Sequence, residues 1–364
     1  MWAFYSQHFK NDYYSLDSMR ICFLTQNFLP AIGGLETQTY EVSKRLVIKG
    51  HEIHLITKMH DGLKDYEVID GIQIHRVQRG SLKVISTLKY YRDVHSKILE
   101  IRPDIVHEQG IGGSGLKIKF PLVVFGRGID IYGGSPLFKR FILIPSLRKA
   151  DVVLAQTEHM KSYMKKVSGR SEIKVIPNGI DTNFKFRNVR KELGFSDNDF
   201  VICNAGRLIP SKKVDELIEL VNSLDGVKLL VVGDGPEMNR LKKIAGKNVV
   251  FLGKKSHTET LNIMHSSDIY VTMTRHTEGF PNVLLEAMLS GLPIVAPNHL
   301  AIPEIIDEGV NGFVVDKDFR SAILRLKDDD KLRRKISNEN LKKVKEYSFD
   351  KIVDELLGVY EGLV

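Results

Sequence analysis

Residues 20–57 read RICFLTQNFLPAIGGLETQTYEVSKRLVIKGHEIHLIT, and their pattern decides the fold. An apolar run at 20–25 leads into a loop with two glycines, an amphipathic stretch at 33–50 and a second apolar run at 51–57. Strand, helix and strand in this order indicate a helical crossover between parallel strands. The sequence therefore predicts an α/β protein built on a parallel sheet.

The same alternation begins again in the second half of the chain. Apolar runs FVICNAGRL at 200–208 and VKLLVVGDGP at 227–236 enclose VDELIELVNSL, which has the apolar spacing of a helix. Further strand-like runs occur at 248–253, 268–274 and 292–297. We therefore expect two doubly wound, Rossmann-like domains whose strand C-terminal ends face a cleft.

The domain boundaries follow from the same patterns. Residues 178–200 are rich in turn residues and lack apolar periodicity, which predicts a first domain at 19–184 and a second at 185–348. Residues 349–364 have the pattern of a helix that packs back against the first domain. Its apolar stripe consists of Ile352, Leu356, Leu357 and Tyr360.

The composition fits an ordinary globular protein and excludes several other classes. The 364 residues are 43% hydrophobic and 27% charged, which rules out a disordered or collagen-like chain. Both cysteines lie in apolar runs, so we expect no disulfide framework and a reducing, cytoplasmic location. No apolar run approaches the ~18 residues that a membrane-spanning helix needs.

Excess positive charge is confined to the first half of the chain. Residues 1–184 carry 26 Lys/Arg and 18 Asp/Glu, a net of +8, whereas residues 185–364 carry 27 of each. One hypothesis is that the first domain meets an anionic partner; the alternative is a basic surface with no specific partner. A nucleic-acid partner, which a pI of about 9.2 would allow, has no matching motif and is not expected.

The first eighteen residues, MWAFYSQHFKNDYYSLDS, lack the basic and apolar regions of a signal peptide. Met19 is followed directly by the first strand-like run. We therefore expect translation to begin at Met19 and residues 1–18 to be a non-native or disordered extension.

The densest motif is RHTEGFPNVLLEAMLSGLPIVAP at 275–297. It predicts a strand that ends at Glu278, a turn over 279–282 and a helix over 283–290 that carries Glu286. Unpaired N–H groups at a helix N-terminus suit a diphosphate, and flanking carboxylates accept hydrogen bonds from sugar hydroxyls. Taken singly, the two glutamates would be an ordinary turn acid and a solvated helix residue. The whole string favours a binding site.

Two strand-to-helix turns of the second domain also carry candidate residues. Arg207 and Lys212 follow the domain's first strand, where two cations are suited to neutralising a phosphate leaving group. Gly233 and Gly235 permit a tight turn, which is either a simple loop or a ligand contact.

The first domain offers a second set of candidates. Gly33 and Gly34 precede a helix and allow a ligand to approach the backbone. His107 and Arg127 are expected to end strands, with Asp130 three residues further on, and strand ends are where such folds place functional groups. No arrangement of His, Cys or carboxylates typical of a metal site occurs in the sequence, so no metal is expected.

Together these motifs resemble the GT-B retaining glycosyltransferases of family 4, also called glycosyl transferases group 1. The resemblance covers nearly the whole chain beyond the first eighteen residues. Glu278 and Glu286 match the E-x7-E signature, and Arg207 and Lys212 match its GRL…K motif. The Gly-Gly loop, PNGID at 177–181 and the GDGP turn match as well.

The resemblance implies a nucleotide-diphosphate-sugar donor held mainly by the second domain. Glu278 would meet the donor sugar hydroxyls and Glu286 the ribose, while Arg207 and Lys212 would bind the diphosphate and stabilise its departure. The backbone at Lys254 would meet the base. Further donor contacts are expected at Gly33, Gly34, Gly233, Gly235, Gly279, Phe280, Pro281, Asn282 and Val283.

One position departs from the family pattern. Many members have His-Gly-x-Asp where this chain has Arg127 to Asp130, so Arg127 replaces a donor-contacting histidine and is a candidate catalytic residue. Arginine cannot act as a base at physiological pH. In the front-face mechanism implied by the resemblance, the leaving phosphate takes the acceptor proton. The family needs no divalent metal, and neither a metal nor another cofactor is expected.

The acceptor is contacted mainly by the first domain in this family, with His107 and Asp130 as candidates here. Residues 88–102 read as a basic helix with aromatic residues, and residues 139–174 carry nine Lys/Arg and three Asp/Glu. We therefore hypothesise a saccharide or lipid-linked, anionic acceptor and peripheral attachment to the inner, anionic membrane surface. A solvated helix face is the alternative.

The expected function is transfer of a hexosyl group in glycan or cell-envelope polysaccharide biosynthesis, with a UDP-sugar favoured over a GDP-sugar as donor. A GT-B-like nucleotide-sugar epimerase is an alternative that the E-x7-E string disfavours. A phosphorylase lacks a visible pyridoxal-binding context. A noncatalytic nucleotide-sugar-binding protein is a further alternative, and donor binding without turnover would identify it.

Overall fold

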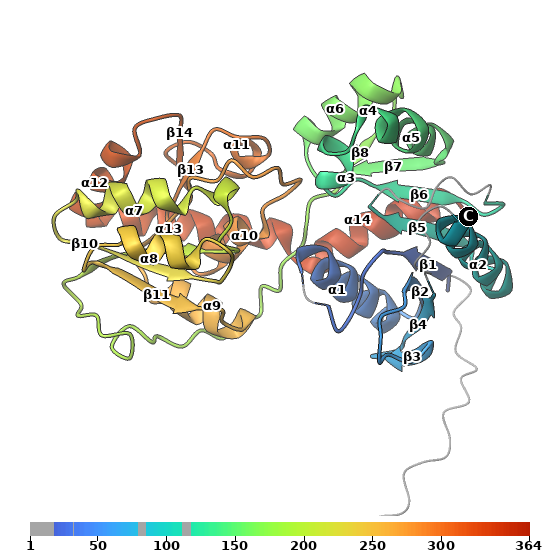
Figure 1. Ribbon diagram of the computed structural model, residues 1–364, viewed down its shortest axis with the longest axis horizontal. Coiled ribbons are helices and arrows are strands. Elements are labelled where there is room, and N and C mark those ends of the chain that lie inside the picture. Colours follow the sequence, from blue (N-terminus) through green and yellow to red (C-terminus); the bar gives the residue numbers. More distant parts are fainter. Residues whose placement is uncertain (1–17, 32, 79–84, 111–117) are drawn as a thin grey trace, which may run out of the picture.

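The computed structural model describes residues 18–31, 33–78, 85–110 and 118–364 and divides into two α/β domains (Figure 1). Apart from Ser18, the predicted N-terminal extension lies outside the described residues. Each domain is built around its own sheet, and the expected pair of doubly wound domains is confirmed.

An eight-stranded sheet in the order β3-β4-β2-β1-β5-β6-β7-β8 forms the centre of the first domain. All neighbours are parallel except β3 and β4, which pair antiparallel at the edge. The short strand β3 was not expected from the sequence. The strands are β1 (Arg20–Leu24), β2 (Glu52–Lys58), β3 (Tyr66–Ile69), β4 (Ile72–Val77), β5 (Ile105–Gln109), β6 (Leu122–Phe125), β7 (Val152–Ala155) and β8 (Lys174–Val175).

Helices cover both faces of this sheet, so its central strands are apolar on both sides. Ile21 and Phe23 of β1 join one core with helix α1, whereas Cys22 and Leu24 join another with α2, α5 and α6. The helical segments are α1 (Gly34–Ile48), α2 (Ile85–Ile101), α3 (Ile129–Tyr132), α4 (Pro136–Phe138), the π-helix η1 (Lys139–Leu143), α5 (Ile144–Lys149) and α6 (Glu158–Ser168).

A six-stranded, all-parallel sheet in the order β11-β10-β9-β12-β13-β14 forms the second domain. The edge strand β14 was not expected from the sequence. The strands are β9 (Phe200–Ala205), β10 (Val227–Val232), β11 (Val249–Gly253), β12 (Ile269–Val271), β13 (Ile294–Pro297) and β14 (Gly312–Val315). The helical segments are η2 (Pro210–Lys212), α7 (Val214–Asn222), α8 (Met238–Ile244), α9 (His257–His265), α10 (Asn282–Leu289), α11 (Ile302–Ile305), α12 (Phe319–Asp328), α13 (Asp330–Lys343) and η3 (Val344–Tyr347).

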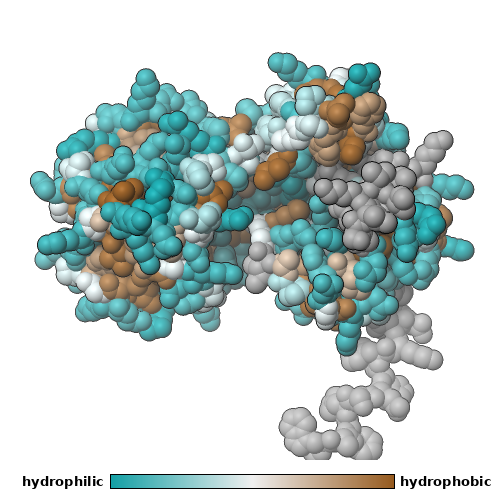
Figure 2. All heavy atoms as spheres, viewed as in Figure 1, coloured by the Kyte–Doolittle hydropathy of each residue, from teal (hydrophilic) through white to brown (hydrophobic). Residues whose placement is uncertain are grey.

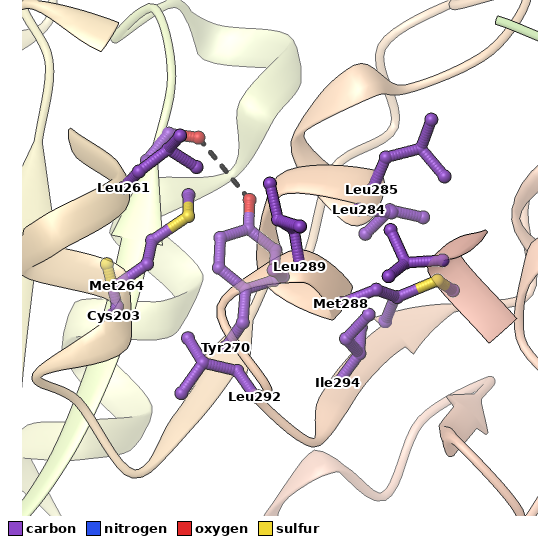
Figure 3. Close-up of a cluster of buried hydrophobic side chains, with 14 of the residues drawn as sticks. Cys203, Leu261, Met264, Tyr270, Leu284, Leu285, Met288, Leu289, Leu292 and Ile294 are labelled. Atoms are coloured by element: carbon purple, nitrogen blue, oxygen red, sulfur yellow. Dashed lines mark hydrogen bonds between the residues drawn. The ribbon is translucent and has the colours of Figure 1, made fainter. Parts of the chain in front are cut away.

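Helix α10 is anchored in the core of the second domain. Leu284, Leu285 and Met288 pack with Tyr270 of β12 in one cluster of buried side chains (Figure 3). The Tyr270 hydroxyl donates a 3.3 Å hydrogen bond to the Ala205 carbonyl, so its polar end is paired in the interior. This packing fixes the direction in which the N-terminus of α10 points.

Helix α14 (Phe349–Glu361) returns the chain to the first domain (Figure 1). A bridge between Ile180 and Ser348 brings the two crossing segments together, and α14 then packs beside α1. Leu357, predicted on the apolar stripe, is only half-buried at the margin of the core. The buried side chains of α14 are Phe349, Ile352, Val353, Leu356, Val359 and Tyr360.

In the described part of the chain, no helix combines the length and the apolar character that crossing a membrane requires.

We predict that Leu356→Ala destabilises the first domain, because Leu356 is 2% exposed in the core shared by α14 and β1. Removing a buried leucine side chain costs about 2–5 kcal/mol. Denaturant unfolding followed by circular dichroism measures the loss. Glu355→Ala, an exposed neighbour on the same helix, should change stability by less than ~0.5 kcal/mol. Equal effects of the two changes would contradict the packing of α14 described above.

Candidate active site

A cleft of about 960 Å³ separates the two domains and is lined from both sides. Figure 2 shows the surface hollowed between them. Strand C-terminal ends of both sheets lead into it, as doubly wound folds require. The predicted site residues that line it are Gly33, Gly34, Arg127, Arg207, Lys212, Gly233, Lys254, Glu278, Gly279, Phe280, Pro281, Asn282, Val283 and Glu286.

An ion pair between Lys212 and Glu278 occupies the wall of the second domain. The Lys212 Nζ lies 2.5 Å from the Glu278 Oε1, and the two side chains are only 16% and 29% exposed. Glu278 does not end a strand, as the sequence predicted, because β12 stops at Val271 and a loop follows. The Arg275 N–H donates to the Ser211 carbonyl at 2.8 Å, which holds this loop against the turn that carries Lys212.

His276 is a cleft residue that the sequence analysis missed. Its Nδ1 lies 2.9 Å from the Ser211 Oγ. Burial, together with the nearby cations Lys212 and Arg207, lowers the pKa of His276 below its ordinary value of 6.5, although Glu278 opposes the shift. The ring is therefore neutral at physiological pH and offers hydrogen bonds without adding charge.

The N-terminus of α10 points its backbone into the cleft. Pro281 precedes the helix, which begins at Asn282, one residue earlier than the sequence predicted. The Phe280 side chain turns into the core, where its ring lies 5.9 Å from that of Tyr347. The Phe280 side chain is therefore directed away from the cleft, and the first N–H groups of the helix carry partial positive charge.

Glu286 lies one turn along α10 and is 20% exposed. Burial raises the pKa of its carboxyl above the ordinary value of 4.5, and the nearby His257 opposes the shift. The His257 Nδ1 lies 3.6 Å from the Glu286 Oε1 at the start of α9. Lys254 lies exposed at the same end of the cleft.

The loop that carries Arg207 is held by the neighbouring turn. Gly233 has φ +134°, and a Cβ there would overlap the Gly206 carbonyl. A Cβ at Gly235 would likewise overlap the carbonyl of Leu208, so the two turns stack backbone to backbone. Gly233 lines the cleft but Gly235 does not. Tight packing between the turns is a sufficient reason for glycine at 235, and the donor contact expected there remains a prediction.

Arg127 lines the cleft, but its guanidinium is bound to side chains of its own domain. The Arg127 Nε donates to the Gln109 Oε1 at 2.8 Å, and its Nη2 donates to the same oxygen. Its Nη1 donates to the Asn178 Oδ1 at 3.0 Å, and its Cζ lies 3.7 Å from the centroid of the Phe125 ring. Burial lowers the pKa of Arg127 to about 9, so the side chain remains cationic at neutral pH.

Asn178 connects this group to the second domain. Its Nδ2 donates a 2.6 Å hydrogen bond to the Oδ1 of Asn282, the first residue of α10. The Gln156 Nε2 donates to the Asn178 Oδ1 at 2.6 Å. Gly34 lies so close that a Cβ there would be 3.1 Å from the Asn282 Nδ2. The PNGID motif contains Asn178, but its partners are distant in sequence, and no local pattern signals these pairings.

Two further contacts bring the domains close together. A Cβ at Gly128, whose φ is +129°, would lie 2.5 Å from the Gly279 nitrogen, so only glycine allows these backbones to meet. The Glu304 carboxylate of the second domain accepts from the Glu158 and His159 N–H groups at 2.7 and 2.6 Å. A carboxylate at the start of α6 is favoured by the helix dipole.

His107 and Asp130 are not among the residues that line this cleft. The burial of His107 contradicts its predicted contact with an acceptor, whereas the acceptor-side role of Asp130 remains a prediction. His107 lies within β5, fully buried, and its Nδ1 contacts the Tyr360 hydroxyl of α14. The returning helix, which the local pattern around His107 does not reveal, covers it. Asp130 accepts hydrogen bonds from the Arg127 backbone N–H at 3.0 and 3.2 Å and so shapes the turn before α3.

Comparisons with known proteins agree with this arrangement. The Glycosyltransferase Family 4 model matches residues 32–184, and the model of glycosyl transferases group 1 matches residues 185–343. The N-acetyl-alpha-D-glucosaminyl L-malate synthase of Bacillus anthracis is 27% identical, covering 91% of this chain and 94% of that protein.

Solved structures share the fold across nearly the whole chain. Sucrose-phosphate synthase from Thermosynechococcus elongatus superposes with a TM-score of 0.82 at 18% identity, covering 95% of this chain and 99% of that one. Anabaena Alr3699/HepE, solved in complex with UDP and glucose, has a TM-score of 0.78 at 22% identity, covering 95% and 100%. The expected GT-B architecture is confirmed, and because the two family models together span residues 32–343, the chain belongs to the GT-B glycosyltransferases of the group 1 and family 4 type.

Proposed function

We propose that this protein is a retaining glycosyltransferase that moves a hexosyl group from a nucleotide-diphosphate sugar to a saccharide or lipid-linked acceptor in cell-envelope polysaccharide biosynthesis. The observation that carries the proposal is the meeting of Lys212, Glu278 and the N-terminus of α10 in one cleft wall. A nucleotide-sugar donor has a diphosphate and a hydroxylated ring, and this wall offers a partner for each.

The positive groups match the charge that develops during transfer. As the bond between the sugar and the diphosphate breaks, negative charge grows on the leaving phosphate. Lys212, Arg207 and the first N–H groups of α10 surround the place where that phosphate would lie. Fixed cations and dipoles in a partly desolvated site stabilise such charge strongly.

Glu278 is suited to holding the donor sugar. Its carboxylate is paired with Lys212, and the pair is partly buried. A bound donor would give Lys212 a phosphate and Glu278 a sugar hydroxyl without leaving either charge unpaired. On this proposal the acceptor oxygen attacks from the face that the phosphate leaves, and its proton passes to the leaving phosphate oxygen.

We propose that transfer needs no metal ion. Among the described residues, no group of three or more His, Cys, Asp or Glu has the arrangement to hold one. The support for the proposal is the set of cations that is present, because Lys212 and Arg207 reach the cleft from one loop. Undiminished turnover in excess chelator is the expected result, and turnover restored only by a divalent ion would contradict it.

A UDP-sugar is the favoured donor. The HepE protein of the same fold was solved with UDP and glucose, and the exposed Lys254 segment leaves space beside Glu286 for a nucleoside. Thermal-shift measurements against UDP-, GDP- and ADP-sugars test this choice, since a ligand that binds only the folded state raises the unfolding temperature. Stabilisation by no nucleotide sugar in the panel would contradict the proposed function itself.

Glu278→Gln is predicted to lower kcat at least about 100-fold, because the neutral amide neither pairs with Lys212 nor accepts as strongly from a sugar hydroxyl. The unfolding midpoint should stay close to that of the parent protein. Glu219→Gln, on the exposed side of α7, is the matched control and should retain full turnover. Retained activity in Glu278→Gln would refute its assignment.

Donor binding is predicted to weaken as the pH falls from neutrality. Burial raises the pKa of Glu286 above 4.5, so its carboxylate is protonated earlier than an ordinary glutamate and then loses its strength as an acceptor for a ribose hydroxyl. Titration calorimetry with UDP at several pH values measures the effect. The Glu286→Gln variant should bind UDP weakly, and its affinity should change less as the pH falls. The same pH dependence as in the parent protein would exclude Glu286 as the group that titrates.

We infer that Arg127 acts by positioning, since its guanidinium is bound to Gln109 and Asn178. Asn282→Ala should lower kcat/KM about tenfold through loss of its hydrogen bond with Asn178. Asn178→Ala should lower it at least as much, because it also removes the acceptor for Arg127 and Gln156. The double variant should lose little more than Asn178→Ala alone, because that change already removes the contact with Asn282. Losses that multiply would show that the two residues act independently.

Arg127→Lys provides a second readout of this positioning role. Lysine keeps the charge but cannot bind both Gln109 and Asn178 with a planar fork. The variant should therefore resemble Asn178→Ala in its kcat and KM. Full activity with lysine would mean that charge alone is required at this position.

A further inference from the structure

An exposed apolar patch lies on the first domain beside the cleft. It consists of Ile129, Leu137, Phe141 and Ile142, which are 65%, 67%, 67% and 38% exposed. Large apolar side chains that remain this exposed within one short segment are unusual and mark interaction surfaces. Figure 2 shows hydrophobic residues gathered over the α4 and α5 region, at the upper right of that view.

The local backbone presents these side chains together. Segments α4, η1 and α5 follow one another without a break from Pro136 to Lys149. Leu137 and Phe141 are four residues apart, which places them on one helical face. The same stretch buries Leu143 and Leu147 in the domain core. This helical stretch therefore has one apolar face that packs on the domain core and a second apolar face that is exposed to solvent.

Positive charge surrounds the patch. Residues 131–150 contain four Lys/Arg and no Asp or Glu. Arg140, Arg148 and Lys149 are exposed, and none of them forms an ion pair within the described residues. Lys139 instead turns inward, where its Nζ donates to the Tyr163 hydroxyl at 2.8 Å. Three cations beside exposed leucine and phenylalanine side chains give the surface both an apolar and an electrostatic preference.

The patch reaches the entrance of the cleft. Ile129 lines the cleft and is 65% exposed on α3, the helix next to the segment that carries Leu137 and Phe141. The Lys139 Nζ donates to the Tyr132 carbonyl at 3.3 Å, which ties α3 to the segment that carries Leu137 and Phe141. A flat partner that covers the patch would therefore lie next to the opening through which an acceptor enters.

We propose that this patch docks the protein on an anionic lipid bilayer, with Leu137 and Phe141 inserted among the headgroups. Exposed apolar side chains with flanking lysine and arginine are the combination by which an interfacial helix binds anionic lipid. The absence of any Asp or Glu from 131–150 removes the repulsion that such a surface would exert. The docked orientation brings the cleft entrance to the bilayer, where a lipid-linked acceptor resides.

Docking itself is independent of the proposed transfer activity; only its use for presenting a lipid-linked acceptor rests on that function. Vesicle binding therefore tests the surface without a donor or acceptor. A protein that binds vesicles but transfers no sugar would refute the proposed function alone. A protein that transfers sugar but binds no vesicle would refute the docking proposal alone.

Co-sedimentation of the full chain with vesicles provides the experiment. We expect binding to phosphatidylcholine vesicles that contain phosphatidylglycerol, weaker binding at high salt, and little binding to phosphatidylcholine alone. Leu137→Ser combined with Phe141→Ser should weaken partition to the anionic vesicles about tenfold or more. Arg140→Gln combined with Lys149→Gln should weaken it by a similar factor at low salt.

A matched control separates this patch from general surface apolarity. Ile48→Ser combined with Val68→Ser removes two apolar side chains that are 74% and 54% exposed elsewhere on the same domain, and it should leave vesicle binding unchanged. Unfolding midpoints of all variants should stay close to that of the parent. Equal recovery with neutral and anionic vesicles, or equal loss in the control, would overturn the proposal and leave a protein partner to account for the patch.

Discussion

The hydrogen bond from Asn178 to Asn282 is the constraint on which the site depends. It joins the last segment of the first domain to the first residue of α10, the helix whose N-terminus faces the cleft. Arg127 donates a hydrogen bond to the Asn178 Oδ1 and another to Gln109, the last residue of the central strand β5. The contact is therefore anchored to the centre of the first sheet. The core around Tyr270 fixes α10 from the other side. A short polar chain between two rigid cores therefore sets where donor and acceptor groups meet.

This contact requires that the backbones approach closely. Gly34, Gly128 and Gly279 each stand where a side chain would press on the opposite domain. Because glycine has no Cβ, the polar groups that meet across the cleft are brought together without steric cost. The enclosure also explains the pairing of the charges, since Lys212 and Glu278 are partly buried and each needs a charged or hydrogen-bonding partner. A donor that separates them must supply both a negative and a hydroxyl group.

The sequence alone predicted site residues that are close together in the chain, but it did not predict contacts between residues that are far apart in the chain. Glu278, Glu286, Arg207 and Lys212 could be identified because the members of each pair are close in sequence, and all four line the cleft. Arg207 and Lys212 share the turn after β9, and Glu278 and Glu286 lie on either side of the start of α10. His107 was misplaced because helix α14 buries it. Tyr360 of this helix, which contacts His107, lies 253 residues later in the chain. The pairing of Asn178 with Asn282 likewise joins residues 104 positions apart. Such side-chain contacts depend on how distant segments of the chain pack together, which no local pattern encodes.

The uneven charge of the two halves has a structural counterpart. The second half of the chain, residues 185–364, has no net excess, yet it directs Arg207 and Lys212 into a partly enclosed cleft, where reduced solvent screening makes each cation effective toward a phosphate. The first domain carries the surplus at its surface, where water and salt screen single charges and only several cations together attract an anionic surface. An apolar patch beside Arg140 and Lys149 adds a contact that salt does not screen. On the proposed function and the proposed docking, cations in the cleft would bind the phosphate of a donor, whereas exposed cations of the first domain would meet an anionic bilayer, and burial accounts for the difference.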